Sequence, residues 1–169
     1  MSKLLVIVNT QNDFISGPLG FKGADIIENN IINALNEYDA YLFIMETHDE
    51  KYLDTIEGSY LQTPHTIKGS DGHKLYGKLN ELKDKAKVVI ESNSFGSKEL
   101  GKWIEKNYYD EIDISGIYSH IQVLENAFIL KTFSPNSKIR VRRDLCISND
   151  KVYEEYAFDL MRSNHIEVK

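Results

Sequence analysis

The sequence predicts a three-layer α/β sandwich around a central, mostly parallel six-stranded sheet. Short apolar runs alternate along the chain with longer segments of helical periodicity. The apolar runs are nearly continuous rather than alternating, which is typical of parallel strands covered on both faces. An alternating order of strands and helices also favours right-handed crossovers around one sheet. The 169 residues suit one such unit, so we predict a single domain spanning residues 1–169.

Six apolar runs predict the strands, because most are rich in β-forming residues and bounded by polar or turn residues. The last of them, at the C-terminal end, is the weakest signal. In chain order they are residues 4–8, 41–45, 87–90, 112–117, 139–141 and 166–168.

Four segments with apolar residues at helical spacing predict the covering helices. They are residues 25–38, 98–106, 119–132 and 149–162. The third is apolar around most of its circumference, so we expect it to be buried against the sheet. Residues 46–79 show no clear period and predict a long ordered loop after a strand. In open parallel sheets, ligands bind at that edge, where the strands end.

The composition argues against a polyanionic partner. The formal net charge of −6 disfavours nucleic acid and anionic membrane surfaces as main partners. No apolar run approaches membrane length, and a lone cysteine suits a reducing compartment, so we expect a cytoplasmic protein. Arg140, Arg142 and Arg143 form the one basic cluster, which we interpret as a solvated edge. Cys146 is interpreted as a structural thiol.

Several short stretches resemble those of one enzyme family. They are IVNTQNDF at residues 7–14 with Gly17 and Gly20, ETHD at 46–49, PH at 64–65, KG at 68–69, FGS at 95–97, ISGIYSHIQVLENA at 114–127 and DLC at 144–146. In this order and spacing, the chain resembles the isochorismatase-like cysteine hydrolases, which include nicotinamidases and related amidases. The resemblance covers nearly the whole chain and implies the same α/β fold.

The resemblance also implies a reaction whose side chains this sequence lacks. In the family, a cysteine attacks a carbonyl carbon, an aspartate takes the thiol proton, and a lysine supports the charges. These three positions fall on Gln122, Asn9 and Ser92. A carboxamide is neither a useful base nor a nucleophile in this chemistry, and serine carries no charge. Hydrolysis by the family mechanism is therefore not expected, and we hypothesise a pseudoenzyme.

A metal site is the second implication of the resemblance. Glu46, His48 and His65 fall on positions where nicotinamidase-like relatives hold a divalent metal through Asp, His and His. Two imidazoles and one carboxylate suit zinc or a similar ion. The alternative is that the histidines only order the loop, in which case the protein has no cofactor.

Four residues are predicted to line a ligand pocket at the same edge: Phe14, Tyr118, His120 and Gln122. The ring of Tyr118 would either stack on a planar ligand or fill part of the pocket. His120 would contact a ligand or simply occupy space. The backbone N–H groups of Tyr118 and Gln122 would bind an oxyanion or carbonyl.

Three functions stay open at this point. The first is a pseudoenzyme that binds a small planar or carbonyl-bearing molecule or regulates a partner. The second is metal-assisted hydrolysis at Glu46, His48 and His65, with His120 as base. The third is a structural or assembly role, because relatives commonly form homo-oligomers. In that case Tyr118 and Gln122 would fill the pocket.

Overall fold

The computed structural model describes residues 1–169 and contains one six-stranded, all-parallel sheet with the order β3-β2-β1-β4-β5-β6. The predicted α/β fold is therefore confirmed. The strands are β1 (Lys3–Val8), β2 (Ala40–Glu46), β3 (Val89–Ser92), β4 (Glu111–Ile117), β5 (Lys138–Ile147) and β6 (Glu167–Val168). Each overlaps its predicted run, but β5 is much longer than predicted.

The main helices also lie where the periodicity placed them. They are α2 (Ile26–Ala34) with the 3₁₀ turn η1 (Leu35–Glu37), α4 (Lys98–Lys106), the π-helical turn η4 (Ser119–Val123) continuing into α5 (Leu124–Phe133), and α6 (Lys151–Ser163). Short helices that the sequence analysis did not predict are α1 (Asn12–Ile15), η2 (Tyr52–Asp54), α3 (Ile56–Tyr60) and η3 (Gly77–Lys85). Residues 46–79 are therefore not a loop without helices, since η2 and α3 lie within them. The sequence showed no helical period there, because α3 has only five residues.

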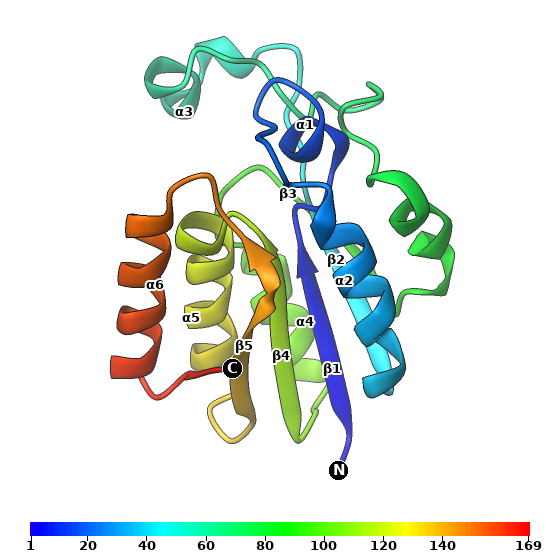
Figure 1. Ribbon diagram of the computed structural model, residues 1–169, viewed down its shortest axis with the longest axis vertical. Coiled ribbons are helices and arrows are strands. Elements are labelled where there is room, and N and C mark those ends of the chain that lie inside the picture. The colour runs from blue at the N-terminus through cyan, green and yellow to red at the C-terminus, as the bar shows by residue number, and fades with distance from the viewer.

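Two apolar clusters, one on each face of the sheet, make the three layers. Helices α4, α5 and α6 cover one face, and α2 with η3 covers the other (Figure 1). Because alternate residues of a strand point to opposite faces, β1 contributes Leu4 and Val6 to the first cluster and Leu5 and Ile7 to the second. None of the helices combines the length and the apolar composition needed to cross a bilayer.

The strand order reverses direction beside the centre of the sheet. The chain proceeds outward from β1 through β2 to β3, and then outward on the other side from β4 through β5 to β6. The topological switch point therefore lies between β1 and β4, where ligands bind in folds of this kind. Asn9 follows β1 and Tyr118 follows β4, while α1 and α3 lie beyond the same strand ends (Figure 1).

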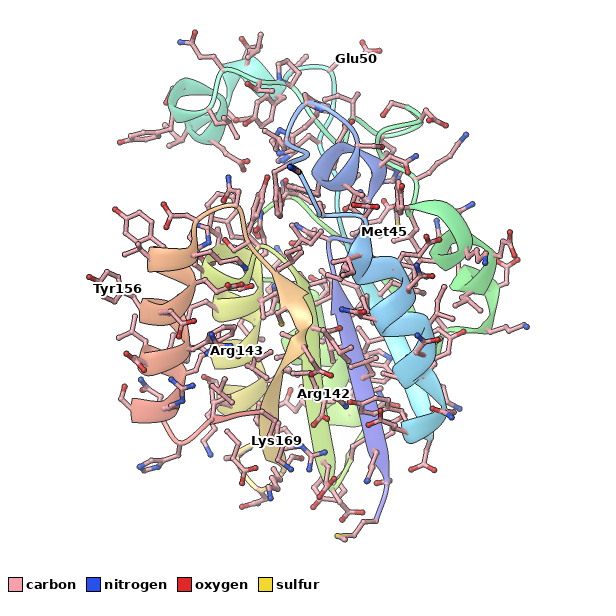
Figure 2. The ribbon with its side chains drawn as sticks, viewed as in Figure 1. Met45, Glu50, Arg142, Arg143, Tyr156 and Lys169 are labelled. Carbon is pink, nitrogen blue, oxygen red and sulfur yellow. The ribbon has the colours of Figure 1, made fainter.

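The interpretation of the arginine cluster as a solvated edge is wrong for Arg140. Its side chain is buried, and Nε donates to Oδ1 of Asp113 at 2.5 Å. β5 is not an edge strand, because β6 pairs with it. Arg140 lies opposite Asp113 in the pairing of β5 with β4, and its guanidinium binds Asp113 and Glu111 there. The side chains of Arg142 and Arg143, also from β5, form ion pairs nearer the surface (Figure 2).

Gly116 marks an irregularity in the pairing of β4 with β5 that no larger residue fits. Its φ is +128°, and an added Cβ would lie 2.0 Å from the carbonyl oxygen of Val8. We expect Gly116→Ala to lower the free energy of unfolding by about 2 kcal/mol or more, since strain at such a position costs about 1–3 kcal/mol. Urea denaturation of the variant measures this loss.

Gly23 is the matched control for this substitution. Its φ is +87°, but nothing lies within 4 Å of an added Cβ. Gly23→Ala therefore adds only the left-handed backbone cost of about 1–2 kcal/mol. Equal losses for the two variants would show that contact with β1 does not constrain Gly116.

Candidate functional site

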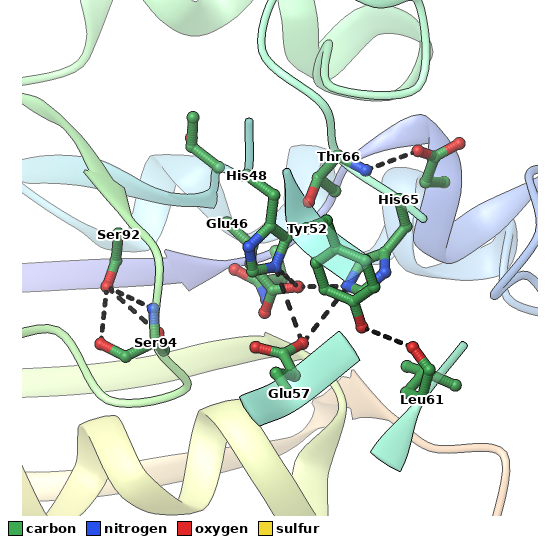
Figure 3. Close-up of polar contacts among 12 residues, drawn as sticks. Glu46, His48, Tyr52, Glu57, Leu61, His65, Thr66, Ser92 and Ser94 are labelled. Carbon is green, nitrogen blue, oxygen red and sulfur yellow. Dashed lines mark hydrogen bonds and ion pairs between the residues drawn. The ribbon is translucent and has the colours of Figure 1, made fainter. Parts of the chain in front are cut away.

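Four side chains with metal-ligating atoms converge at the carboxyl end of β2. Glu46, His48, Glu57 and His65 each direct one such atom into a space where all four atoms lie within 4.8 Å of one another (Figure 3). We call these four residues the Glu/His cluster. Glu46, His48 and His65 were predicted from the sequence, and the structure brings them together. Glu57, which belongs to α3, was not predicted.

Local pairing of two loop segments sets the positions of the two histidines. His48 N–H donates to the carbonyl of Thr66 at 3.1 Å, and Lys68 N–H donates to the carbonyl of His48 at 2.8 Å. This short parallel pairing places His65 beside His48, with ring centroids 5.0 Å apart. The buried ring of Tyr52 packs against both imidazoles and holds them in place.

The imidazole Nε2 atoms face the two carboxylates. Oε1 of Glu46 lies 2.7 Å from Nε2 of His65 and 3.3 Å from Nε2 of His48. Oε1 of Glu57 lies 3.7 Å and 3.6 Å from the same two nitrogens. This Glu57 oxygen is buried and has no hydrogen-bond partner. A buried, unpartnered carboxylate oxygen facing two imidazoles indicates a place for a cation.

The second nitrogen of His65 supports the same interpretation. Nδ1 lies 2.8 Å from the carbonyl oxygen of Thr63. A carbonyl only accepts hydrogen bonds, so Nδ1 donates to it, and Nε2 donates to Glu46 when the ring is protonated. Burial lowers the pKa of His65, but these hydrogen bonds to Glu46 and Thr63 raise it overall. When a cation replaces the second proton, Nε2 faces the cation while Nδ1 keeps its bond to the carbonyl. This is the orientation found in metal-ligating histidines. Two imidazole nitrogens and two carboxylate oxygens fit zinc or a similar divalent ion.

Glu46 is fully inside the protein, yet its carboxylate is held in the ionised form. Burial raises its pKa, but hydrogen bonds from His48 and His65 outweigh that effect and lower the pKa to about 2. Its backbone is equally constrained: Gln11 accepts from the N–H of Glu46 and donates to its carbonyl, both at 2.8 Å. The carboxylate is therefore a fixed, charged group, which is the form that binds a metal ion.

The second carboxylate oxygen of Glu46 connects the cluster to two of the positions assigned to the catalytic triad. Oε2 accepts a hydrogen bond from Nδ2 of Asn9 at 3.1 Å and another from Nε2 of Gln122 at 3.0 Å. All three side chains are buried. The carboxamides at the positions assigned to base and nucleophile therefore bind Glu46.

The oxygen of the Gln122 carboxamide binds a backbone N–H group. Oε1 accepts a hydrogen bond from the N–H of Tyr118 at 3.1 Å. A backbone N–H only donates and a carboxylate only accepts, so these two contacts fix the orientation of the amide. The Tyr118 N–H that was predicted to bind an oxyanion is engaged within the protein itself.

Ser92, the third assigned triad position, lies apart from this network. Its hydroxyl contacts Ser94, at 3.1 Å from the carbonyl oxygen and 3.3 Å from the side-chain oxygen (Figure 3). It has no hydrogen bond to Glu46. The structure therefore brings Asn9 and Gln122 together around one carboxylate but leaves Ser92 outside.

Aromatic packing fills much of the edge where the sequence placed a ligand pocket. The ring of Phe14 is buried, with its centroid 5.7 Å from those of Tyr118 and His65. The hydroxyl of Tyr118 donates to the carbonyl of Leu19 at 2.5 Å. His120 points elsewhere, because its Nδ1 lies 2.6 Å from the hydroxyl of Ser148, and burial lowers its pKa.

The open space lies on the other side of the cluster, between α3 and the segment after β3. One cavity of about 420 Å³ and another of about 430 Å³ share Ile56, Glu57 and Asn93. Tyr60 and Phe95 give the second cavity aromatic walls. None of the residues predicted to line a pocket, Phe14, Tyr118, His120 and Gln122, lines either of these cavities.

The free thiol is not part of any of these groups. Cys146 packs partly buried against the core, and burial raises the pKa of its thiol. Its Sγ lies 3.9 Å from the carbonyl oxygen of Ile114. A thiol in these surroundings stays protonated and is a poor nucleophile.

Comparisons with known proteins agree on one family. The isochorismatase domain matches residues 3–168. A Bacillus subtilis (strain 168) protein described as an uncharacterized isochorismatase family protein, PncA, is 30% identical over 143 residues, covering 75% of this chain and 77% of the relative.

Solved structures show the same fold. The nicotinamidase/pyrazinamidase PncA from Bacillus subtilis superposes with a TM-score of 0.85 at 24% identity, covering 99% of both chains. The pyrazinamidase of Pyrococcus horikoshii, solved in complex with zinc, has a TM-score of 0.86 at 18% identity and covers 100% of this chain and 99% of its own.

Proposed function

The chain belongs to the isochorismatase domain family, and from that premise we propose that it binds a divalent metal ion and a small ligand without performing thiol-dependent hydrolysis. One observation carries the proposal: the carboxylate of Glu46 is shared between the two halves of the site. Oε1 faces the imidazoles of the Glu/His cluster, and Oε2 accepts from the carboxamides of Asn9 and Gln122.

The chemistry of the assigned triad positions supports the absence of thiol hydrolysis. Gln122 offers no nucleophile, and Asn9 offers no base. Both side chains are also committed to Glu46, and the Tyr118 N–H is occupied by Gln122. A substrate carbonyl would find none of these groups free.

The Glu/His cluster would hold the metal ion through Glu46, His48, Glu57 and His65. A divalent cation bound there supplies a Lewis-acid centre that attracts a carbonyl or carboxylate oxygen. The likeness to a pyrazinamidase solved with zinc supports zinc as the first ion to test. The ligand would be a small planar or carbonyl-bearing molecule that packs on Ile56 and Phe95.

Metal content and turnover together test this proposal. We expect the purified protein, stripped with a chelator and dialysed against zinc, to retain about one equivalent of metal. The same sample should not hydrolyse nicotinamide above the buffer rate, with the Bacillus subtilis nicotinamidase as a positive control. Retention of well below one equivalent of zinc would overturn the proposed metal site. Nicotinamide hydrolysis that persists in the presence of a chelator would show that the protein does hydrolyse amides without a metal ion.

Metal-assisted hydrolysis is the second candidate, and one observation favours it. The cavity of about 420 Å³ opens directly on His48 and Glu57. His120 does not line that cavity and faces Ser148, so it is poorly placed for the role of base. Amide turnover that survives Gln122→Ala but disappears with chelation would favour this candidate over the first.

A further inference from the structure

We propose that Asn9 and Gln122 act as positioning residues for the metal ion, holding the carboxylate of Glu46 so that its Oε1 faces His48 and His65. This inference rests on the proposed metal site and goes beyond it. Two positions that the family resemblance assigns to catalysis, Asn9 and Gln122, would then orient a metal ligand instead.

The geometry of Glu46 gives the first argument. Its two oxygens have separate partners: imidazoles at 2.7 and 3.3 Å on Oε1, and carboxamides at 3.1 and 3.0 Å on Oε2. Two donors that converge on Oε2 fix the rotation of the carboxylate. Groups that orient a metal ligand in this way change metal affinity by about 10- to 100-fold when they are removed.

Charge gives the second argument. A carboxylate binds a metal ion in its ionised form and Glu46 is buried, so the groups that contact its Oε2 have to be hydrogen-bond donors without negative charge. Asn9 and Gln122 meet this requirement. An aspartate at position 9 would place a second carboxylate where Nδ2 now donates at 3.1 Å. Two carboxylates in contact cannot both stay ionised without a large cost.

The local backbone makes this idea testable with conservative changes. Asn9 has a φ of +50°, a region that asparagine and aspartate both tolerate, and its N–H donates to the carbonyl of Ile44 at 2.9 Å. Asn9→Asp therefore changes the donor but not the backbone preference. Gln122→Glu likewise keeps an oxygen that accepts from the N–H of Tyr118 and replaces the donor to Glu46 by a charged acceptor.

The test measures zinc affinity by competition with a chromophoric chelator. We expect Asn9→Asp and Gln122→Glu each to weaken zinc binding by about 10- to 100-fold. The visible spectrum of the cobalt-substituted protein should shift in both variants, because the orientation of one ligand changes. Asn36→Asp is the matched control: it makes the same chemical change at an exposed residue of η1 and should leave affinity and spectrum unchanged.

A rescue variant separates positioning from general structural damage. Glu46→Asp shortens the side chain by one methylene and withdraws its carboxylate from residue 9. We therefore expect the double variant Asn9→Asp/Glu46→Asp to bind zinc more tightly than Asn9→Asp alone. If the double variant instead lost as much zinc affinity as Asn9→Asp and Glu46→Asp lose together, the positioning role would be overturned.

The outcomes distinguish this inference from the proposed function. If the wild-type protein does not retain zinc, the metal site itself fails. If the wild-type protein retains zinc and both charged variants bind it equally well, only the positioning role fails. Urea denaturation of the metal-free variants identifies any variant that fails to fold. If a charged variant fails to fold, zinc affinity is measured for Gln122→Met, which removes the donor without adding a charge. A zinc affinity equal to that of the wild-type protein would overturn the inference.

Discussion

Replacing His65 with alanine is expected to abolish stoichiometric zinc binding. Its Nε2 lies 2.7 Å from Oε1 of Glu46, and its Nδ1 is fixed by the carbonyl of Thr63. Loss of a supporting residue alone lowers metal affinity about 10- to 100-fold, and loss of a ligand should exceed that range. Metal analysis of the dialysed protein measures the change directly.

Thermal unfolding gives a second measurement of the same variant. Zinc at about 100 times its Kd should stabilise the wild-type protein by about 2.7 kcal/mol. For a chain of this length, that corresponds to a rise in Tm of about 5–10 °C. The His65→Ala protein should show no such rise, because its binding site is incomplete.

His73 provides a control with the same chemical change. It is also a buried histidine, but its Nε2 lies 2.7 Å from the hydroxyl of Thr47, outside the Glu/His cluster. His73→Ala should therefore keep the zinc-dependent rise in Tm. If His65→Ala kept it as well, the cluster would not be the zinc site.

The fold was predictable because its signals are local. Buried parallel strands contain nearly continuous apolar runs, and helices 9–13 residues long, such as α4 and α6, show a clear period. The errors occur where three-dimensional context decides. Arg140 looks like a surface residue in the sequence, but it is buried, because Asp113 on the neighbouring strand β4 lies opposite it and binds its guanidinium. The five-residue helix α3 is too short to show any period.

The site was predictable in part and for a different reason. The resemblance to a known family selected Glu46, His48 and His65, and the structure brings them together. Glu57 was missed because its place depends on how α3 folds over the strand ends. The contacts of Asn9 and Gln122 with Glu46 were also missed, because they depend on three strands being neighbours in the sheet. The residue types alone indicated only that Asn9 and Gln122 are unable to serve as base and nucleophile.

Arg140→Met is expected to lower the free energy of unfolding by about 3–5 kcal/mol. Its guanidinium binds Asp113 at 2.5 Å and Glu111 at 2.7 Å, and the side chains of Arg140 and Asp113 are both buried. Burial lowers the pKa of Arg140, but the hydrogen bonds to these two carboxylates raise it overall, so the arginine stays charged. Methionine fills similar space but leaves the buried carboxylate of Asp113 without its cation, and breaking one half of such a pair has this cost.

Urea denaturation measures that loss against a surface pair. Arg162 binds Asp159 at 2.7 Å, but both side chains are largely exposed, so Arg162→Met should cost about 1 kcal/mol or less. The double variant Arg140→Met/Asp113→Leu removes the uncompensated charge together with its partner. It should recover part of the stability lost in Arg140→Met, because an apolar pair can replace a buried ion pair at little cost. No recovery would mean that Arg140 contributes through its packing rather than through its charge.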